Sequence, residues 1–212
     1  MKVLLYGGTF DPPHNGHMNN LRAALERVQP DRAIVMPAGI PPHKAASATP
    51  GPVRLAMCAC FTALSPVVEV SDWEIRQGGR SYTLHTLEML RERFPGAELY
   101  LSVGSDMLLG FQKWRRWQDI LQMADLVVES RRPGDEAALH QAAETLQAAG
   151  GRVLFAHAES YPCASSELRT GQIPRAAWGQ YLPDIVRQVI DAEGLYSGVQ
   201  TLPEKEELCH DL

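Results

Sequence analysis

Short apolar runs alternate with helix-forming segments along most of this chain, and no other feature constrains its fold as strongly. Val3 to Tyr6 is apolar and is closed by Gly7 and Gly8, which predicts a buried strand that enters a tight turn. Further strands are expected at 32–36, 67–70, 98–103, 124–129 and 152–156. Helices are expected at 16–28, 53–64, 82–94, 135–149 and 183–192, and again after residue 106. This alternation predicts an α/β fold with a doubly wound, mostly parallel sheet and helices on both faces.

The length of 212 residues and the apolar content of 45% suffice for an ordinary core without disulfides or metals. We expect one domain over residues 1–196, followed by a charged, mobile tail at 197–212 that has little to bury. Cys58, Cys60, Cys163 and Cys209 form no CxxC pair, and unpaired thiols suit a reducing compartment. Because no apolar run is long enough for a signal peptide or a membrane span, we expect a cytoplasmic protein.

The charge balance bears on the partners of this chain. Lys and Arg number 20 and Asp and Glu number 25, which gives a formal net charge of −5. Nucleic acids and anionic membranes are bound through a basic footprint, so neither is expected as the main partner. Phosphate binding stays open if cations gather locally.

The unusual segments of the chain fall where a parallel sheet binds ligands. In open parallel sheets, ligands bind outside the carboxyl ends of the strands. The segments expected at that edge are GGTFDPPHNGH at 7–17, PPHK at 41–44, GSD at 104–106, RRPG at 131–134 and ASSELR at 164–169. Their clustering predicts one ligand site.

The first of these segments carries the strongest chemical signal. Gly7 and Gly8 allow backbone N–H groups to approach an anion, and the helix that follows offers its N-terminus to the same charge. His14 and His17 are three residues apart, so both imidazoles can lie on one side and donate hydrogen bonds to phosphate oxygens during phosphoryl transfer. Two alternatives for the pair are surface or capping residues and a metal site, although no third ligand stands at a recognisable spacing.

The full eleven-residue string resembles the HxGH signature of the nucleotidyltransferase superfamily, in the GGTFDP form of nicotinate-nucleotide adenylyltransferases. The resemblance extends to PPHK, SYTLHTL at 81–87, GSDML at 104–108, FQKW at 111–114, RRPG and GLY at 194–196, and so covers about the first 196 residues. It implies a Rossmann-like fold that transfers AMP from ATP to nicotinic acid mononucleotide, giving deamido-NAD and pyrophosphate in NAD biosynthesis. Mg²⁺ would be carried on the ATP phosphates, so no protein ligand for a metal is assigned.

The resemblance also implies roles for individual residues. His14 and His17 would be catalytic, with His17 nearest the transferring group. The residues implied for ATP binding are Gly8, Thr9, Phe10, His14, His17, Lys44, Gly104, Asp106, Arg132, Ser165, Ser166 and Arg169. Those implied for the mononucleotide are Gly7, Thr9, Thr83, Trp114 and Arg115.

Three positions depart from the family pattern. Ala164 stands where the family usually has Ser, and Ser166 where it often has Thr, which puts the role of Ser165 in doubt. Arg115 stands where Tyr is frequent. Because the contact implied there is made by the backbone N–H, we expect the change to be tolerated and the Arg to add favourable charge.

Other functions are compatible with parts of the pattern. An enzyme of the same superfamily could adenylylate nicotinamide mononucleotide or phosphopantetheine instead, but the phosphopantetheine enzymes look shorter and lack the SYTLHTL and FQKW pair. A non-catalytic nucleotide-binding regulator is the alternative from another class. The presence of His14, His17, Lys44 and Arg169 argues against it.

Overall fold

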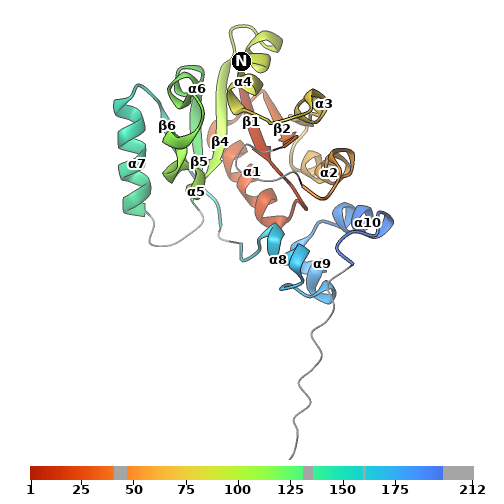
Figure 1. Ribbon diagram of the computed structural model, residues 1–212. Coiled ribbons are helices and arrows are strands. Elements are labelled where there is room, and N and C mark those ends of the chain that lie inside the picture. Colours follow the sequence, from red (N-terminus) through yellow and green to blue (C-terminus); the bar gives the residue numbers. More distant parts are fainter. Residues whose placement is uncertain (41–46, 131–135, 160, 198–212) are drawn as a thin grey trace, which may run out of the picture.

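The computed structural model describes residues 1–40, 47–130, 136–159 and 161–197. Six strands form one sheet in the order β3-β2-β1-β4-β5-β6, and each neighbouring pair is parallel (Figure 1). The strands are β1 (Lys2–Gly8), β2 (Arg32–Pro37), β3 (Val68–Val70), β4 (Glu98–Gly104), β5 (Ala124–Ser130) and β6 (Val153–His157). The chain order reverses beside β1, which pairs with β2 on one side and β4 on the other. A ligand crevice is expected at this switch point.

Helices cover both faces of the sheet. They are α1 (Asn15–Val28), α2 (Gly51–Cys58), α3 (Trp73–Gln77), α4 (Thr83–Arg93), α5 (Ser105–Leu109), α6 (Trp117–Met123), α7 (Glu136–Ala148), α8 (Ser165–Thr170), α9 (Trp178–Tyr181) and α10 (Asp184–Ala192), with the 3₁₀ turns η1 (Ala59–Leu64), η2 (Phe111–Lys113) and η3 (Arg175–Ala177). Leu4 and Tyr6 of β1 pack with α1, α2 and α10, whereas Val3 and Leu5 pack with α4, α6 and α7. This alternation confirms the doubly wound fold.

The helix α1 shows how the sequence specifies this packing. Leu21, Ala24 and Val28 recur at helical spacing and are all buried against the sheet. Phe61 of η1 is fully buried beside the rings of Tyr6 and Phe10, with centroids 5.7 and 5.1 Å away. Burying an apolar side chain of this size contributes about 1.5–3 kcal/mol. The end of β1, which carries the glycine turn, is therefore fixed by a well-packed aromatic cluster.

Every strand expected from the sequence is present, and the sheet is parallel throughout the described residues. The helix expected at 53–64 is divided into α2 and the 3₁₀ turn η1. Trp73–Gln77 forms a short helix that the pattern did not predict. In the described part of the chain, no helix is both long and apolar enough to cross a bilayer. The tail from residue 198 onward lies outside the described residues.

Candidate active site

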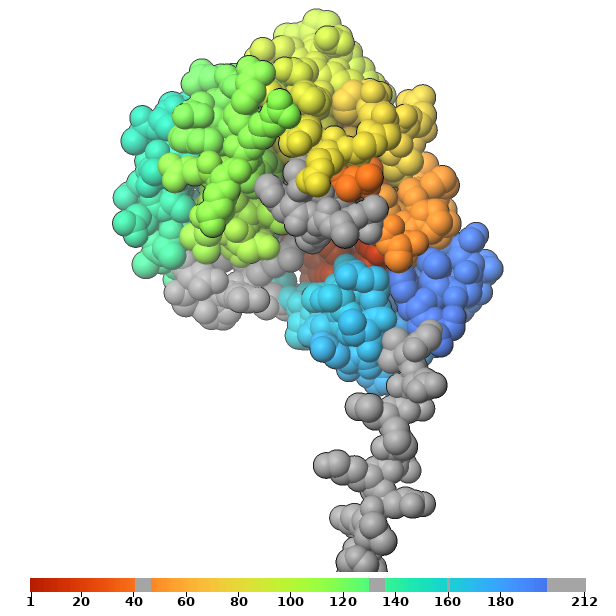
Figure 2. Space-filling view, in the orientation of Figure 1, coloured from red at the N-terminus to blue at the C-terminus, as the bar shows by residue number. Residues whose placement is uncertain are grey.

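A cavity of about 1130 Å³ opens at the carboxyl ends of the strands. In Figure 2 the N-terminal part of the chain, in red, is seen recessed between segments from the middle and the end of the chain. The cavity collects all the described members of the predicted site: Gly7, Gly8, Thr9, Phe10, His14, His17, Thr83, Gly104, Asp106, Trp114, Arg115, Ser165, Ser166 and Arg169. Lys44 and Arg132 lie outside the described residues, so their roles stay predictions.

The two histidines stack at the start of α1. His14 is the N-cap residue, and its ring centroid lies 3.8 Å from that of His17. The Nδ1 atom of His14 accepts the Gly16 N–H at 3.1 Å, and Nδ1 of His17 accepts the His14 N–H at 3.2 Å. Because both Nδ1 atoms act as acceptors, the neutral rings carry their protons on Nε2. Each ring therefore has an Nε2–H group, which is able to donate a hydrogen bond to a phosphate oxygen.

A steric contact explains why position 16 of the HNGH string is a glycine. A Cβ atom built on it would lie 2.9 Å from Cε1 and 3.0 Å from Nδ1 of His14. The Cβ atom of Tyr161 would lie 3.4 Å from the same added atom. His14 is 3% exposed, so its ring has little room to move aside. A residue without a side chain is needed at 16 for the imidazole to keep its place.

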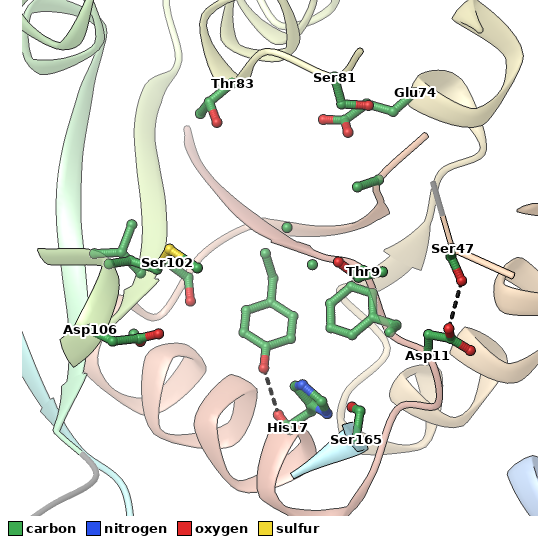
Figure 3. Close-up of a pocket in the computed structure, with 18 of the residues that line it drawn as sticks. Thr9, Asp11, His17, Ser47, Glu74, Ser81, Thr83, Ser102, Asp106 and Ser165 are labelled. Carbon is green, nitrogen blue, oxygen red and sulfur yellow. Dashed lines mark hydrogen bonds between the residues drawn. The ribbon is translucent and has the colours of Figure 1, made fainter. Parts of the chain in front are cut away.

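Asp11 joins the N-terminal loop to three distant parts of the chain. Ser47 donates to Oδ2 at 2.6 Å (Figure 3), and Tyr196 donates to Oδ1 at 2.5 Å. The Arg169 Nε lies 3.9 Å from Oδ2, and its Nη1 donates to the Asp11 carbonyl. Burial acts to raise the pKa of Asp11, but the hydrogen bonds from Ser47, Thr49 and Tyr196 and the charge of Arg169 outweigh it, and the pKa is lowered. Asp11 is thus held as a carboxylate that ties the N-terminal loop to α8 and to the end of the fold.

The helix α8 contributes its hydroxyl and cation to the same loop. Ser165 donates from Oγ to the Pro12 carbonyl at 2.8 Å. Ala164 is the N-cap residue and has no side-chain acceptor, and Glu167 accepts the Ala164 N–H at 2.7 Å. A guanidinium has five N–H donors, so the contacts of Arg169 with Asp11 leave donors for an anion. Figure 3 shows Ser165 and His17 together at one end of the cavity.

The opposite end of the cavity is built differently. Figure 3 places Thr83, Ser81 and Glu74 there, with Thr9 between this end and His17. Trp114 stacks on Phe111 with centroids 5.0 Å apart, and the Arg115 guanidinium lies 4.9 Å from the ring centre of Tyr82. An aromatic face, a helix N-terminus at Thr83 and a cation therefore meet at one place. Together they suit a flat ring that carries a carboxylate.

Several residues in and around the cavity were not predicted. Arg54 is 3% exposed, and it donates to the carbonyls of Thr9, Gly39 and Thr49. Its signal was a single charged residue in the otherwise apolar run GPVRLAMC. Glu129, which is buried, accepts a hydrogen bond from Ser102 at 2.5 Å.

Two further groups lining the cavity have raised pKa values. Burial raises the pKa of Glu74, against hydrogen bonds from Thr86 and Ser81. Burial also raises the pKa of Cys163 to about 12, with a smaller contribution from Glu167. The thiol of Cys163 therefore stays protonated near neutral pH, and a thiol in that form is a poor nucleophile.

The cavity lies at the switch point of the sheet and has two imidazoles, a glycine turn and an arginine at one end. This arrangement defines a nucleotide-binding transferase fold. Comparison with known proteins specifies the family. The profile of the cytidylyltransferase-like family matches residues 5–171. The chain belongs to this family, and within it to the nicotinate-nucleotide adenylyltransferases.

Two bacterial relatives, each named probable nicotinate-nucleotide adenylyltransferase, support this placement. The one from Neisseria meningitidis is 34% identical over 201 residues, covering 92% of this chain and 98% of the relative. The one from Acidithiobacillus ferrooxidans is 36% identical over 208 residues, covering 92% and 95%. The fold matches that of Plasmodium falciparum nicotinic acid mononucleotide adenylyltransferase complexed with NaAD, with a TM-score of 0.72, 16% identity and coverage of 92% and 97%.

Proposed function

We infer that this chain transfers the adenylyl group of ATP to nicotinic acid mononucleotide, forming deamido-NAD and pyrophosphate. The observation that carries the inference is the two-ended cavity. At one end lie His17 and Arg169, the latter beside Asp11. At the other lie the helix N-terminus at Thr83 and Arg115, which is beside Tyr82, and Figure 3 shows Thr9 between Thr83 and His17. Two anionic substrates can therefore meet at the loop.

The reaction needs alignment more than proton transfer. A phosphate oxygen of the mononucleotide attacks the α-phosphorus of ATP in line. The bond between the α-phosphorus and the oxygen that bridges it to the β-phosphorus breaks, and pyrophosphate is released. The attacking phosphate is already anionic near neutral pH, so no general base is required. His14, His17 and Arg169 bind the ATP phosphates and stabilise the charge that develops on them. Ser165 and Ser166 add hydroxyls, and Ser165 also holds the Pro12 carbonyl.

The remaining predicted residues orient the two substrates. Asp106 is exposed in the first turn of α5 beside Gly104, and its carboxylate accepts hydrogen bonds from a ribose of ATP. Trp114 stacks on the pyridine ring of the acceptor. Thr83 and the backbone N–H of Arg115 hold its carboxylate. Nicotinic acid mononucleotide is preferred because its carboxylate charge meets hydrogen-bond donors and a cation there. The amide of nicotinamide mononucleotide is neutral and gains no attraction from that cation.

The residues of the cavity fit a magnesium ion that arrives on ATP. In the described residues, no three His, Cys, Asp or Glu side chains cluster as a metal site. Of the lining carboxylates, Asp11, Glu74 and Glu129 already accept hydrogen bonds from protein hydroxyls. An ion coordinated by phosphates and water would neutralise phosphate charge without a protein cage. We place this reaction in the cytoplasm, where thiols such as Cys163 persist.

The test is an acceptor assay. The purified protein, supplied with ATP, Mg²⁺ and nicotinic acid mononucleotide, releases pyrophosphate, and does so far more slowly with nicotinamide mononucleotide. We expect His17→Ala to lower turnover at least about a hundredfold, because one transition-state donor is lost. The control is His140→Ala on the exposed side of α7, outside the cavity. Equal rates with the two acceptors would refute the acid preference, and nucleotide binding without turnover would indicate a regulator.

A further inference from the structure

Arg54 occupies an unusual position for a charged residue. It is the single charged side chain of α2 and is 3% exposed. Its Nη1 donates to the Thr9 carbonyl at 2.8 Å, Nε to the Thr49 carbonyl at 3.2 Å and Nη2 to the Gly39 carbonyl at 3.3 Å. Burying a cation is costly, and an apolar side chain of similar volume often stabilises a fold as well or better. The three carbonyls that the guanidinium holds therefore point to a role beyond stability.

The contact with Thr9 fixes the orientation of a peptide group that borders the cavity. In a trans peptide the C=O and the following N–H point in opposite directions. Because the Thr9 carbonyl is turned toward Arg54, the Phe10 N–H is turned away from it. Phe10 has a φ of 50°, a conformation that non-glycine residues rarely adopt, and its ring is anchored beside Tyr6 and Phe61. The peptide is thus held from both sides.

The amide donors of this loop are available for a ligand. Within the part of the chain that the structure describes, the N–H groups of Thr9 and Phe10 find no acceptor in the protein. Both residues line the cavity, and Figure 3 shows Thr9 between its two ends. Backbone donors whose direction is fixed in advance stabilise developing charge without reorganisation during the reaction.

We propose that Arg54 is a positioning residue, which holds the Thr9–Phe10 peptide so that its N–H meets the charge that develops on the transferred phosphoryl group. The proposal rests on the proposed function, because it assigns the reacting phosphate to this loop. Arg54 itself touches no substrate. It acts from behind the loop through the Thr9 carbonyl, while Thr49 and Gly39 fix the guanidinium plane.

Arg54→Lys tests the proposal. Lysine keeps the positive charge but is a compact ammonium that cannot hold three diverging carbonyls in one plane. We expect kcat to fall about a hundredfold, as for a misplaced reacting group. The KM values for both substrates and the affinity for α,β-methylene-ATP by calorimetry should stay near those of the wild type, since ground-state contacts are kept. Arg54→Met, which loses the charge but fills similar volume, should show the same separation.

Met57→Ala is the matched control on the same helix. Met57 is fully buried and does not line the cavity, so its truncation should lower the melting temperature and leave kcat unchanged below that temperature. If Arg54→Lys keeps a wild-type kcat, or loses kcat and nucleotide affinity together, the proposal is overturned.

A readout that needs no turnover separates this proposal from the proposed function. In ¹⁵N–¹H correlation spectra, Arg54→Lys should shift the Thr9 and Phe10 amide resonances and leave those of α7 unchanged. Unchanged Thr9 and Phe10 resonances would overturn the positioning role. A wild-type enzyme that turns over no acceptor, with these shifts still present, would overturn the proposed function instead.

Discussion

Gly16→Ala should separate activity from stability in this protein. The added Cβ would lie 2.9 Å from Cε1 and 3.0 Å from Nδ1 of His14, whereas carbon atoms in contact are about 3.5–4.0 Å apart. The His14 ring must therefore move by roughly 0.5–1 Å. That movement also disturbs the bond from the Gly16 N–H to Nδ1, which is 3.1 Å long.

The effects on stability oppose each other. Replacing Gly by Ala inside a helix favours folding by about 1 kcal/mol, while losing an N-cap hydrogen bond costs about 1 kcal/mol. The free energy of unfolding should change little. A displacement of about 1 Å at a group that acts in the reaction can lower the rate about a hundredfold.

The measurement is kcat for pyrophosphate release beside urea unfolding of the same preparation. Gly179→Ala in α9 is the control, because a Cβ there meets only Arg187 at 3.9 Å and the residue is outside the cavity. A Gly16→Ala enzyme that keeps wild-type kcat would show that the imidazole tolerates the methyl group, and the steric explanation of the HNGH glycine would be wrong.

Two more predictions concern charged groups of the cavity. Asp11→Asn should lower the free energy of unfolding by about 1.5–3 kcal/mol at pH 7, since hydrogen bonds to a charged acceptor are lost. Because the folded-state pKa of Asp11 is lowered, this difference is complete above the unfolded pKa of about 3.9 and shrinks as the pH falls through the lowered value. Urea unfolding at pH 7 and pH 3 checks it, and an equal difference at both contradicts it. Arg115→Gln should raise KM for nicotinic acid mononucleotide up to about fivefold at low salt, because an exposed ion pair contributes at most about 1 kcal/mol. KM for nicotinamide mononucleotide should not change. The control is Arg116→Gln, which removes the exposed ion pair with Asp119 and should change neither KM. Equal effects of Arg115→Gln on the two acceptors would exclude a role of the Arg115 charge.

Much of the fold could be predicted because its signals are local. The strand at 3–6 and the helix at 16–28 are each indicated by their own apolar residues, and their observed bounds differ from the expected ones by at most two residues. Trp73–Gln77 was missed because five residues are too few to establish a helical period. The helix at 53–64 changes to a 3₁₀ turn at Ala59, which the apolar pattern does not indicate.

The site divides in the same way. Its motif residues could be collected from the sequence because parallel strands bring their carboxyl ends to one edge. Arg54 could not, nor could Ser47 and Tyr196 as partners of Asp11, because each acts through a contact between segments far apart in the chain. The sequence around Tyr196 does not indicate which residue accepts the hydrogen bond of its hydroxyl.

The N-terminal loop is held by hydrogen bonds from residues near the end of the fold, and this bears on when an active enzyme forms during synthesis. Ser165, Arg169 and Tyr196 reach back to the loop across 153, 158 and 185 residues. Domains fold as the ribosome releases them from the N-terminus, so β1 and its glycine turn emerge first and wait for α8 and Tyr196. A nascent chain that ends before Tyr196 contains all six strands of the sheet but lacks the hydroxyl that donates to Asp11. Competence to bind and adenylylate would arrive only with the last turns of the fold.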